Sequence, residues 1–145
     1  MLEIIESDGK TLAIILRRSF SEPGIRFFTP GDYSQQLGHM RYSKGKLIEP
    51  HVHNEVPRAI TMTQEVLFVR CGKVRVDFYR EDRSYTESRI LESGDVILLA
   101  SGGHGFEALD DLEMVEVKQG PYMGEQDKTR FKAPKMTKFV FGRSS

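Results

Sequence analysis

Short apolar runs recur at about ten-residue intervals along the chain, with Gly, Pro, Ser, Asn or Asp between them. The runs are rich in Val, Ile, Phe and Thr, and none keeps a 3.6-residue period over the length of a helix. Many short strands with regular turn signals are typical of an all-β sandwich or barrel. The sequence predicts strands at residues 2–5, 11–16, 25–29, 37–42, 46–53, 65–71, 73–80, 95–100, 105–109 and 112–118, and a weaker one at 88–92.

The totals favour one ordinary globular domain. The 145 residues are enough to bury a core, so we expect a single domain over residues 1–145. Lys plus Arg (21) equals Asp plus Glu (21), so net charge gives no reason to expect nucleic acid or an anionic membrane as a partner. No signal peptide and no run of apolar residues long enough to span a membrane is recognisable, which predicts a cytoplasmic protein. The single cysteine, Cys71, is expected to be a buried small side chain.

The stretch from Gly45 to Gly72 holds the most informative side chains. His51 and His53 are two residues apart, so on a strand they would share one face. Glu65 begins a later apolar run, and His104 follows another in the glycine-rich sequence SGGHGF. Three imidazoles and one carboxylate form a ligand set suited to Fe, Mn, Ni, Cu or Zn. We therefore expect one divalent transition metal ion here.

These residues resemble the cupin family. The first cupin motif is matched at its start by Gly45, five residues and His51-Val-His53, and at its end by Glu65, six residues and Gly72. Eleven residues, 54–64, stand where the family has three or four. The second motif is matched by Gly94 and His104, although Ala100 replaces its proline, the spacing is one residue short and Ala108 replaces its asparagine. The resemblance covers about residues 38–118, between N-terminal strands and a basic C-terminal tail.

The resemblance implies a double-stranded β-helix, the jelly-roll barrel of cupins, which commonly forms a homodimer. It places the metal inside the barrel, bound by His51, His53, Glu65 and His104. Glu55 lies in the enlarged loop and is an alternative ligand, but Glu65 alone keeps the spacing to the glycine turn and begins a strand. The loop at 54–64 would lie at the barrel mouth and influence substrate selectivity.

The last predicted strand of the core adds two charged candidates. Leu112, Met114, Glu116 and Lys118 share one of its faces. If that face points into the barrel, the two charges must pair or contact a ligand, because an unpaired buried charge is costly. Glu116 and Lys118 are thus either one internal ion pair or catalytic residues that act together with His51, His53 and His104.

Three functions remain open at this point. The first is a metal-dependent enzyme, such as an isomerase or oxygenase, acting on a small carbohydrate, carboxylate or keto compound. The second is a metal-free isomerase similar to the cupin-like dTDP-sugar 3,4-ketoisomerases, which the stretches SDGKTLAIIL and GPYMGEQDKTRF resemble and which use histidines as acid and base. The third is a non-catalytic sugar-binding protein.

The tail from Lys128 onwards carries six basic residues and no acidic one. We expect it to be solvated or to form a last strand over the domain at residues 138–141. An arm that binds an anion or a partner is the alternative.

Overall fold

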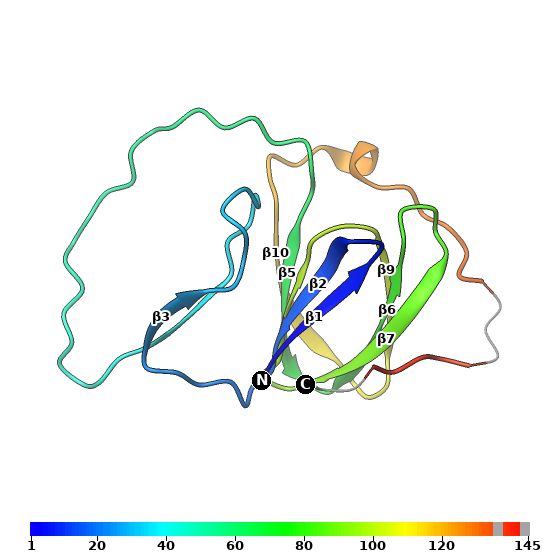
Figure 1. Cartoon of the computed structure of the whole chain (residues 1–145), viewed down its shortest axis with the longest axis horizontal. Helices are drawn as coiled ribbons and strands as arrows, with labels where there is room; N and C mark the ends of the chain where they lie inside the picture. The colour runs from blue at the N-terminus through cyan, green and yellow to red at the C-terminus, as the bar shows by residue number, and fades with distance from the viewer. Residues whose placement is uncertain (135–137, 143–145) are drawn as a thin grey trace.

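The computed structural model describes residues 1–134 and 138–142, and its regular elements are strands and one 3-10 helix (Figure 1). The all-β prediction is confirmed. The strands are β1 (Leu2–Ser7), β2 (Lys10–Leu16), β3 (Gly24–Phe27), β4 (Gly38–Arg41), β5 (Glu65–Cys71), β6 (Lys73–Tyr79), β7 (Tyr85–Glu92), β8 (Val96–Leu99), β9 (Gly103–Ala108) and β10 (Glu113–Lys118), and the 3-10 helix is η1 (Gly124–Asp127). No helix in these two ranges is long and apolar enough to cross a membrane.

Two antiparallel sheets face each other across the core. One has the strand order β1-β2-β8-β5-β10 and the other β7-β6-β9. Alternate residues point inward, as the period of two requires: Val74, Val76 and Phe78 of β6 are buried against Leu67 and Val69 of β5. The sheets are not closed into a barrel.

The turn between β5 and β6 carries the chain from one sheet to the other. Gly72 has φ +87°, a conformation that favours glycine. A Cβ atom there would lie 2.1 Å from the carbonyl oxygen of Asp111, so the space also excludes a side chain. The glycine at the end of the first motif therefore has a structural role in bringing two chain segments close together.

A separate hairpin, β3–β4, lies beside the outer face of the five-stranded sheet (Figure 1). The chain around it packs on that face through a second cluster, in which Leu37 joins Ile14, Val66 and Leu98. The hairpin's own face with Ile25, Phe27 and Met40 is exposed.

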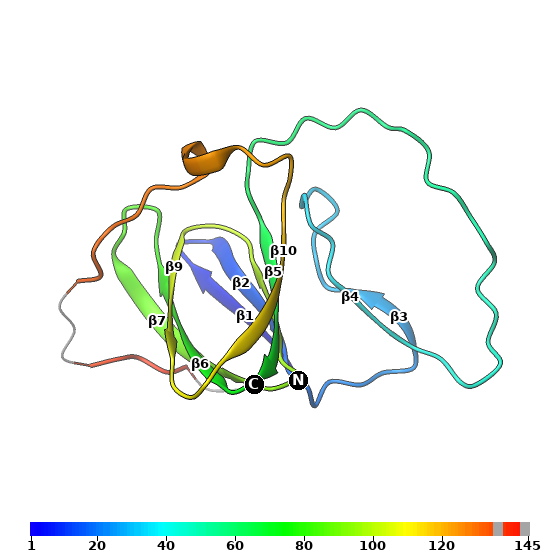
Figure 2. The ribbon, with the colours of Figure 1, turned by 180° about the vertical axis from the view of Figure 1, so that it is seen from behind.

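Residues 42–64, which we call the arm, contain no strand or helix and run as an open loop away from the sandwich (Figures 1 and 2). The predicted strand at residues 46–53 is therefore wrong within this chain. Its apolar side chains are fully in solvent, with Leu47 87% and Val52 86% exposed. A strand needs a neighbouring edge to satisfy its backbone groups, and no strand pairs with these residues in the described part of the chain.

Both sheets end on the same side of the sandwich in a strand with one free edge. β9 pairs only with β6, and β10 pairs only with β5. The short turn at residues 109–112 joins these two edge strands, which are seen in front in Figure 2. The opening of the sandwich therefore lies between β9 and β10.

The C-terminal segment lies over the domain, as expected for the tail. The backbone N–H of Ser88 donates a 2.7 Å hydrogen bond to the carbonyl oxygen of Val140. The Arg75 guanidinium lies 3.7 Å from the centre of the Phe139 ring. Residues 138–141 thus cover the outer face of the three-stranded sheet.

Candidate functional site

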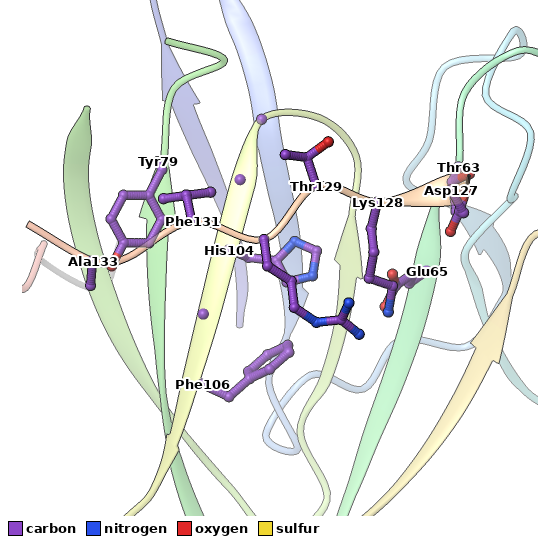
Figure 3. Close-up of a pocket in the computed structure, with 14 residues that line it drawn as sticks. Thr63, Glu65, Tyr79, His104, Phe106, Asp127, Lys128, Thr129, Phe131 and Ala133 are labelled. Carbon is purple, nitrogen blue, oxygen red and sulfur yellow. Dashed lines mark hydrogen bonds between the residues drawn. The ribbon is translucent and has the colours of Figure 1, made fainter. Parts of the chain in front are cut away.

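A cavity of about 580 Å³ lies at the end of the sandwich where β5 begins, β6 ends and β9 begins (Figure 3). Residues after η1 cover it from above. The lining residues are Thr63, Glu65, Tyr79, the stretch 102–106, the stretch 127–131 and Ala133. The cavity is the size of a site for a small organic molecule.

His104 points into this cavity from β9. It is opposite Phe78 in the register with β6, so it shares the inward face with the core residues of that strand. Figure 3 shows the imidazole directed toward Lys128 and Glu65. Burial lowers the pKa of His104, and the Lys128 charge lowers it further, whereas Glu116 acts in the opposite direction. His104 is thus held as a neutral imidazole that can accept a proton.

Glu65 and Glu116 form a carboxyl pair at the wall of the cavity. Glu65 is the first residue of β5 and lies opposite Lys118 of β10, and Glu116 lies opposite the inward-facing Leu67, so both glutamates share one sheet face. Burial, a hydrogen bond with Glu116 and the charge of Glu116 raise the pKa of Glu65 to about 7. Glu65 is therefore partly protonated at near-neutral pH and can act as a proton donor.

The cationic residues near the cavity differ in their partners. Lys118 Nζ lies 3.1 Å from Asp127 Oδ2, and this contact raises the pKa of Lys118. Asp127 also accepts a hydrogen bond from the Thr63 hydroxyl. Lys128 lines the cavity, and within the described ranges it forms no salt bridge. Lys128 is thus the cation that remains available for an anionic group.

Glu116 and Lys118 were expected to be either one internal ion pair or catalytic residues, and the ion pair is wrong. The two residues do not pair with each other as one ion pair: Glu116 binds Glu65, and Lys118 binds Asp127. Asp127 and Lys128 were missed by sequence reasoning. Their only signal was the start of the basic tail, and nothing in that pattern indicates that this segment covers a cavity.

The structure brings together Glu65, His104, Glu116 and Lys118 but not the other two predicted site residues. His51 and His53 are exposed on the arm. Their rings face each other at 5.3 Å between centroids, and Nδ1 of His51 lies 3.0 Å from the carbonyl oxygen of Glu49. Glu55, the alternative ligand, is on the arm as well. His51 and His53 therefore lie next to each other but outside the cavity.

The predicted metal was tested against the residues as they lie. Within residues 1–134 and 138–142, no group of three or more His, Cys, Asp or Glu side chains is arranged to hold a metal ion. One imidazole and the carboxylates are in the cavity, and two imidazoles are on the arm. The arrangement within one chain does not fit the expected ligand set. Cys71 is exposed, so its expected burial is wrong.

Comparison of the chain with protein-family models, curated proteins and solved structures finds no match. The functional argument therefore depends on the cavity and the arm.

Proposed function

We propose that this protein is an enzyme that binds a small anionic organic molecule in the cavity and transfers protons on it. The observation that carries the proposal is the position of Glu65 and His104 in one cavity of about 580 Å³, with Glu116 next to Glu65 on the same sheet face. A proton donor and a proton acceptor in one concave site are what general acid–base catalysis requires. Perturbed pKa values of two neighbouring groups support the same assignment.

The reaction class that suits these groups is isomerisation next to a carbonyl. The substrate carries a hydroxyl group on the carbon beside the carbonyl. His104 takes the proton from that carbon, and Glu65, protonated next to Glu116, gives its proton to the carbonyl oxygen. The product of this step is an enediol. Return of one proton to the former carbonyl carbon and loss of the other hydroxyl proton give the isomer and restore both groups, so atoms balance without a co-reactant.

Lys128 defines the substrate class in this proposal. Its ammonium group has no carboxylate partner in the described ranges and lies beside Glu65 and His104 (Figure 3). A carboxylate or phosphate group on the substrate would pair with it and place the carbonyl at the acid and base. Sugar phosphates, sugar nucleotides and keto acids meet this requirement.

We also propose that the fold is a cupin-type jelly roll that is open between β9 and β10. Two facing antiparallel sheets, the glycine turn at Gly72 and the position of His104 after β8 support this assignment. The enzyme proposal does not depend on it, because a fold does not determine an activity.

A metal-dependent enzyme is the second candidate, and the pairing of the His51 and His53 rings favours it. Together with Glu65 and His104 these imidazoles would bind a divalent transition metal, which would act as a Lewis acid. This requires the arm to bring His51 and His53 to a cavity that contains Glu65 and His104. Metal analysis of the wild type and of the double variant His51→Ala/His53→Ala tests it, and equal metal contents in the two proteins would exclude it.

The principal experiment combines ligand binding with proton exchange. Sugar phosphates, sugar nucleotides and keto acids are screened by thermal shift, and each ligand found is incubated with the protein in D₂O and followed by NMR. We expect binding and deuterium incorporation at the carbon beside the carbonyl. Binding without exchange would indicate a non-catalytic binding protein, and no binding across the panel would reject the proposal.

A pair of lysine variants tests the role of Lys128. Lys128→Ala should weaken binding of the anionic ligand at least tenfold, by about 1.4 kcal/mol or more. Lys132→Ala is the matched control, since Lys132 is an exposed lysine of the same segment that does not line the cavity. Equal losses in the two variants would show that Lys128 contributes only general charge.

A further inference from the structure

The arm contacts its own chain at its C-terminal end, where Thr63 donates a hydrogen bond to Asp127 and Gln64 is buried, whereas residues 46–53 are exposed along their whole length. Its 23 residues, 42–64, form no regular structure, and unstructured loops of this length are uncommon in compact domains. Six of its large apolar side chains are exposed: Leu47, Ile48, Val52, Val56, Ile60 and Met62. Exposed apolar side chains that follow each other along one segment indicate a surface that is covered by something else.

The free edge of β9 is a position in the sandwich where a further strand can be added. Its backbone groups on the side away from β6 meet no strand in the described ranges. Such an edge is a template for an added strand. The inward side of β9 is also uncovered, because Phe106, which follows His104 on that face, is 40% exposed.

Residues 46–53 have the pattern of a strand that fits this edge. Leu47, Glu49, His51 and His53 would share one face. When that face is turned inward along β9, the two histidines are on the same side of the sheet as His104. Pro50 has the opposite parity, so in a strand antiparallel to β9 its missing N–H would point away from β9, which is tolerated in an edge strand.

The length of the connection favours insertion into a second molecule. Neighbouring strands of one chain are usually joined by two to six residues. Here eleven residues, 54–64, separate His53 from Glu65. When extended they span about 36–40 Å, enough to leave the sandwich and cross to another copy.

Exposed apolar surface on the sandwich also favours a second copy. The hairpin face has Ile25 52%, Phe27 55% and Met40 60% exposed. On the outer face of the five-stranded sheet, Phe68 of β5 and its opposite residue Val115 of β10 are each 41% exposed. An arm that folded back onto its own β9 would leave these two surfaces in water, and they remain available to a second copy.

We propose that this chain forms a two-fold dimer in which each arm adds residues 46–53 as a strand to the free edge of β9 in the other copy, bringing His51 and His53 into that copy's cavity. Each copy gives an arm and receives one, so the interface is closed and symmetric. The proposal rests on the proposed function in taking this cavity as the site. In the dimer each site is built from two chains.

Cysteine cross-linking tests the exchange directly. In a Cys71→Ser background, one chain carries Val52→Cys with one affinity tag and another carries Glu107→Cys with a second tag. Val52 and Glu107 are exposed and would lie on the same outer face of adjacent strands. After the two chains are refolded together, we expect a short bis-maleimide to give a covalent product with both tags. Glu6→Cys on β1, which is at the other edge of the sandwich, replaces Glu107→Cys as the control and should give no such product.

A chain carrying both Val52→Cys and Glu107→Cys separates exchange from self-insertion. Exchange predicts covalent dimers on a denaturing gel. Cross-linking within single chains, or no cross-linking in a variant whose circular dichroism matches the wild type, would overturn the proposal. The experiment needs no ligand. Cross-linked dimers that bind none of the anionic compounds would support the strand exchange and reject the proposed function. Monomers cross-linked within one chain that bind these compounds would reject the exchange and support the proposed function.

Discussion

The raised pKa of Glu65 should make the stability of the protein fall as the pH rises. The pKa of Glu65 is raised from its ordinary value of 4.5 to about 7 by burial and by Glu116. Between these two values the folded state binds more protons than the unfolded state. The free energy of unfolding therefore decreases with pH over this window and levels off above pH 7.

The size of the effect follows from the same two pKa values. Their difference of about 2.5 corresponds to at most about 3.4 kcal/mol at 1.36 kcal/mol for each pKa unit. Glu65 is only partly buried, so solvent screening reduces the expected effect to about 1–2 kcal/mol. Glu65→Gln removes the titrating group and keeps a side chain that can donate a hydrogen bond to Glu116.

Urea unfolding of the wild type and of Glu65→Gln at pH 5, 6, 7 and 8 measures this effect. The wild type should lose about 1–2 kcal/mol relative to the variant between pH 5 and pH 8. Glu6→Gln is the control, because Glu6 is an exposed glutamate of β1 at the other edge of the sandwich, and its profile should follow the wild type. Parallel profiles for the wild type and Glu65→Gln would refute the raised pKa of Glu65.

Two further predictions concern the glycine turn and the two-chain site. Gly72→Ala should destabilise the fold by about 3 kcal/mol or more in urea unfolding, because its Cβ would lie 2.1 Å from a carbonyl oxygen. Gly45 has a similar φ of +88°, but no atom lies within 4 Å of the place of its Cβ, so Gly45→Ala should destabilise the fold by only about 1 kcal/mol. Equal losses would contradict the close approach at Gly72. Refolding a His51→Ala/His53→Ala chain with a His104→Ala chain should restore proton exchange at about a quarter of all sites, because half of the dimers are mixed and each has one complete site. No recovery would indicate that each chain builds its own site.

Strand alternation predicted which side chains share a face but not what covers that face. In β6, the alternation of the sequence predicts a half-exposed strand with Val74, Val76 and Phe78 on one face and Arg75, Asp77 and Tyr79 on the other, and the first three side chains are buried as predicted. The second face was expected to be half exposed, yet Asp77 is 6% exposed, because the C-terminal segment lies over it. Packing of a tail against a sheet depends on tertiary contacts that a period of two does not contain.

The same limit explains which part of the site the sequence predicted. Glu65 and His104 come together because each lies at a strand end, and strand ends can be located from the alternation and the glycine turns. The partners of Glu116 and Lys118 depend on the register of β10 against β5 and on the position of η1, which local sequence does not determine. His51 and His53 depend on a strand partner, and the pattern of a strand does not specify the chain that supplies it.

Addition of the arm to β9 would change the solvent exposure of the cavity. In the single chain, Glu116 is exposed and Phe106 of β9 is 40% exposed, so water reaches the groups that would transfer protons. Water raises the local dielectric constant and weakens the electrostatic effects on which such groups depend. A strand added along β9 would cover Phe106 and restrict the water at Glu65 and His104. The segment that carries the two histidines is therefore also the one that would give the acid and base a drier environment, and one event, dimer formation, would do both.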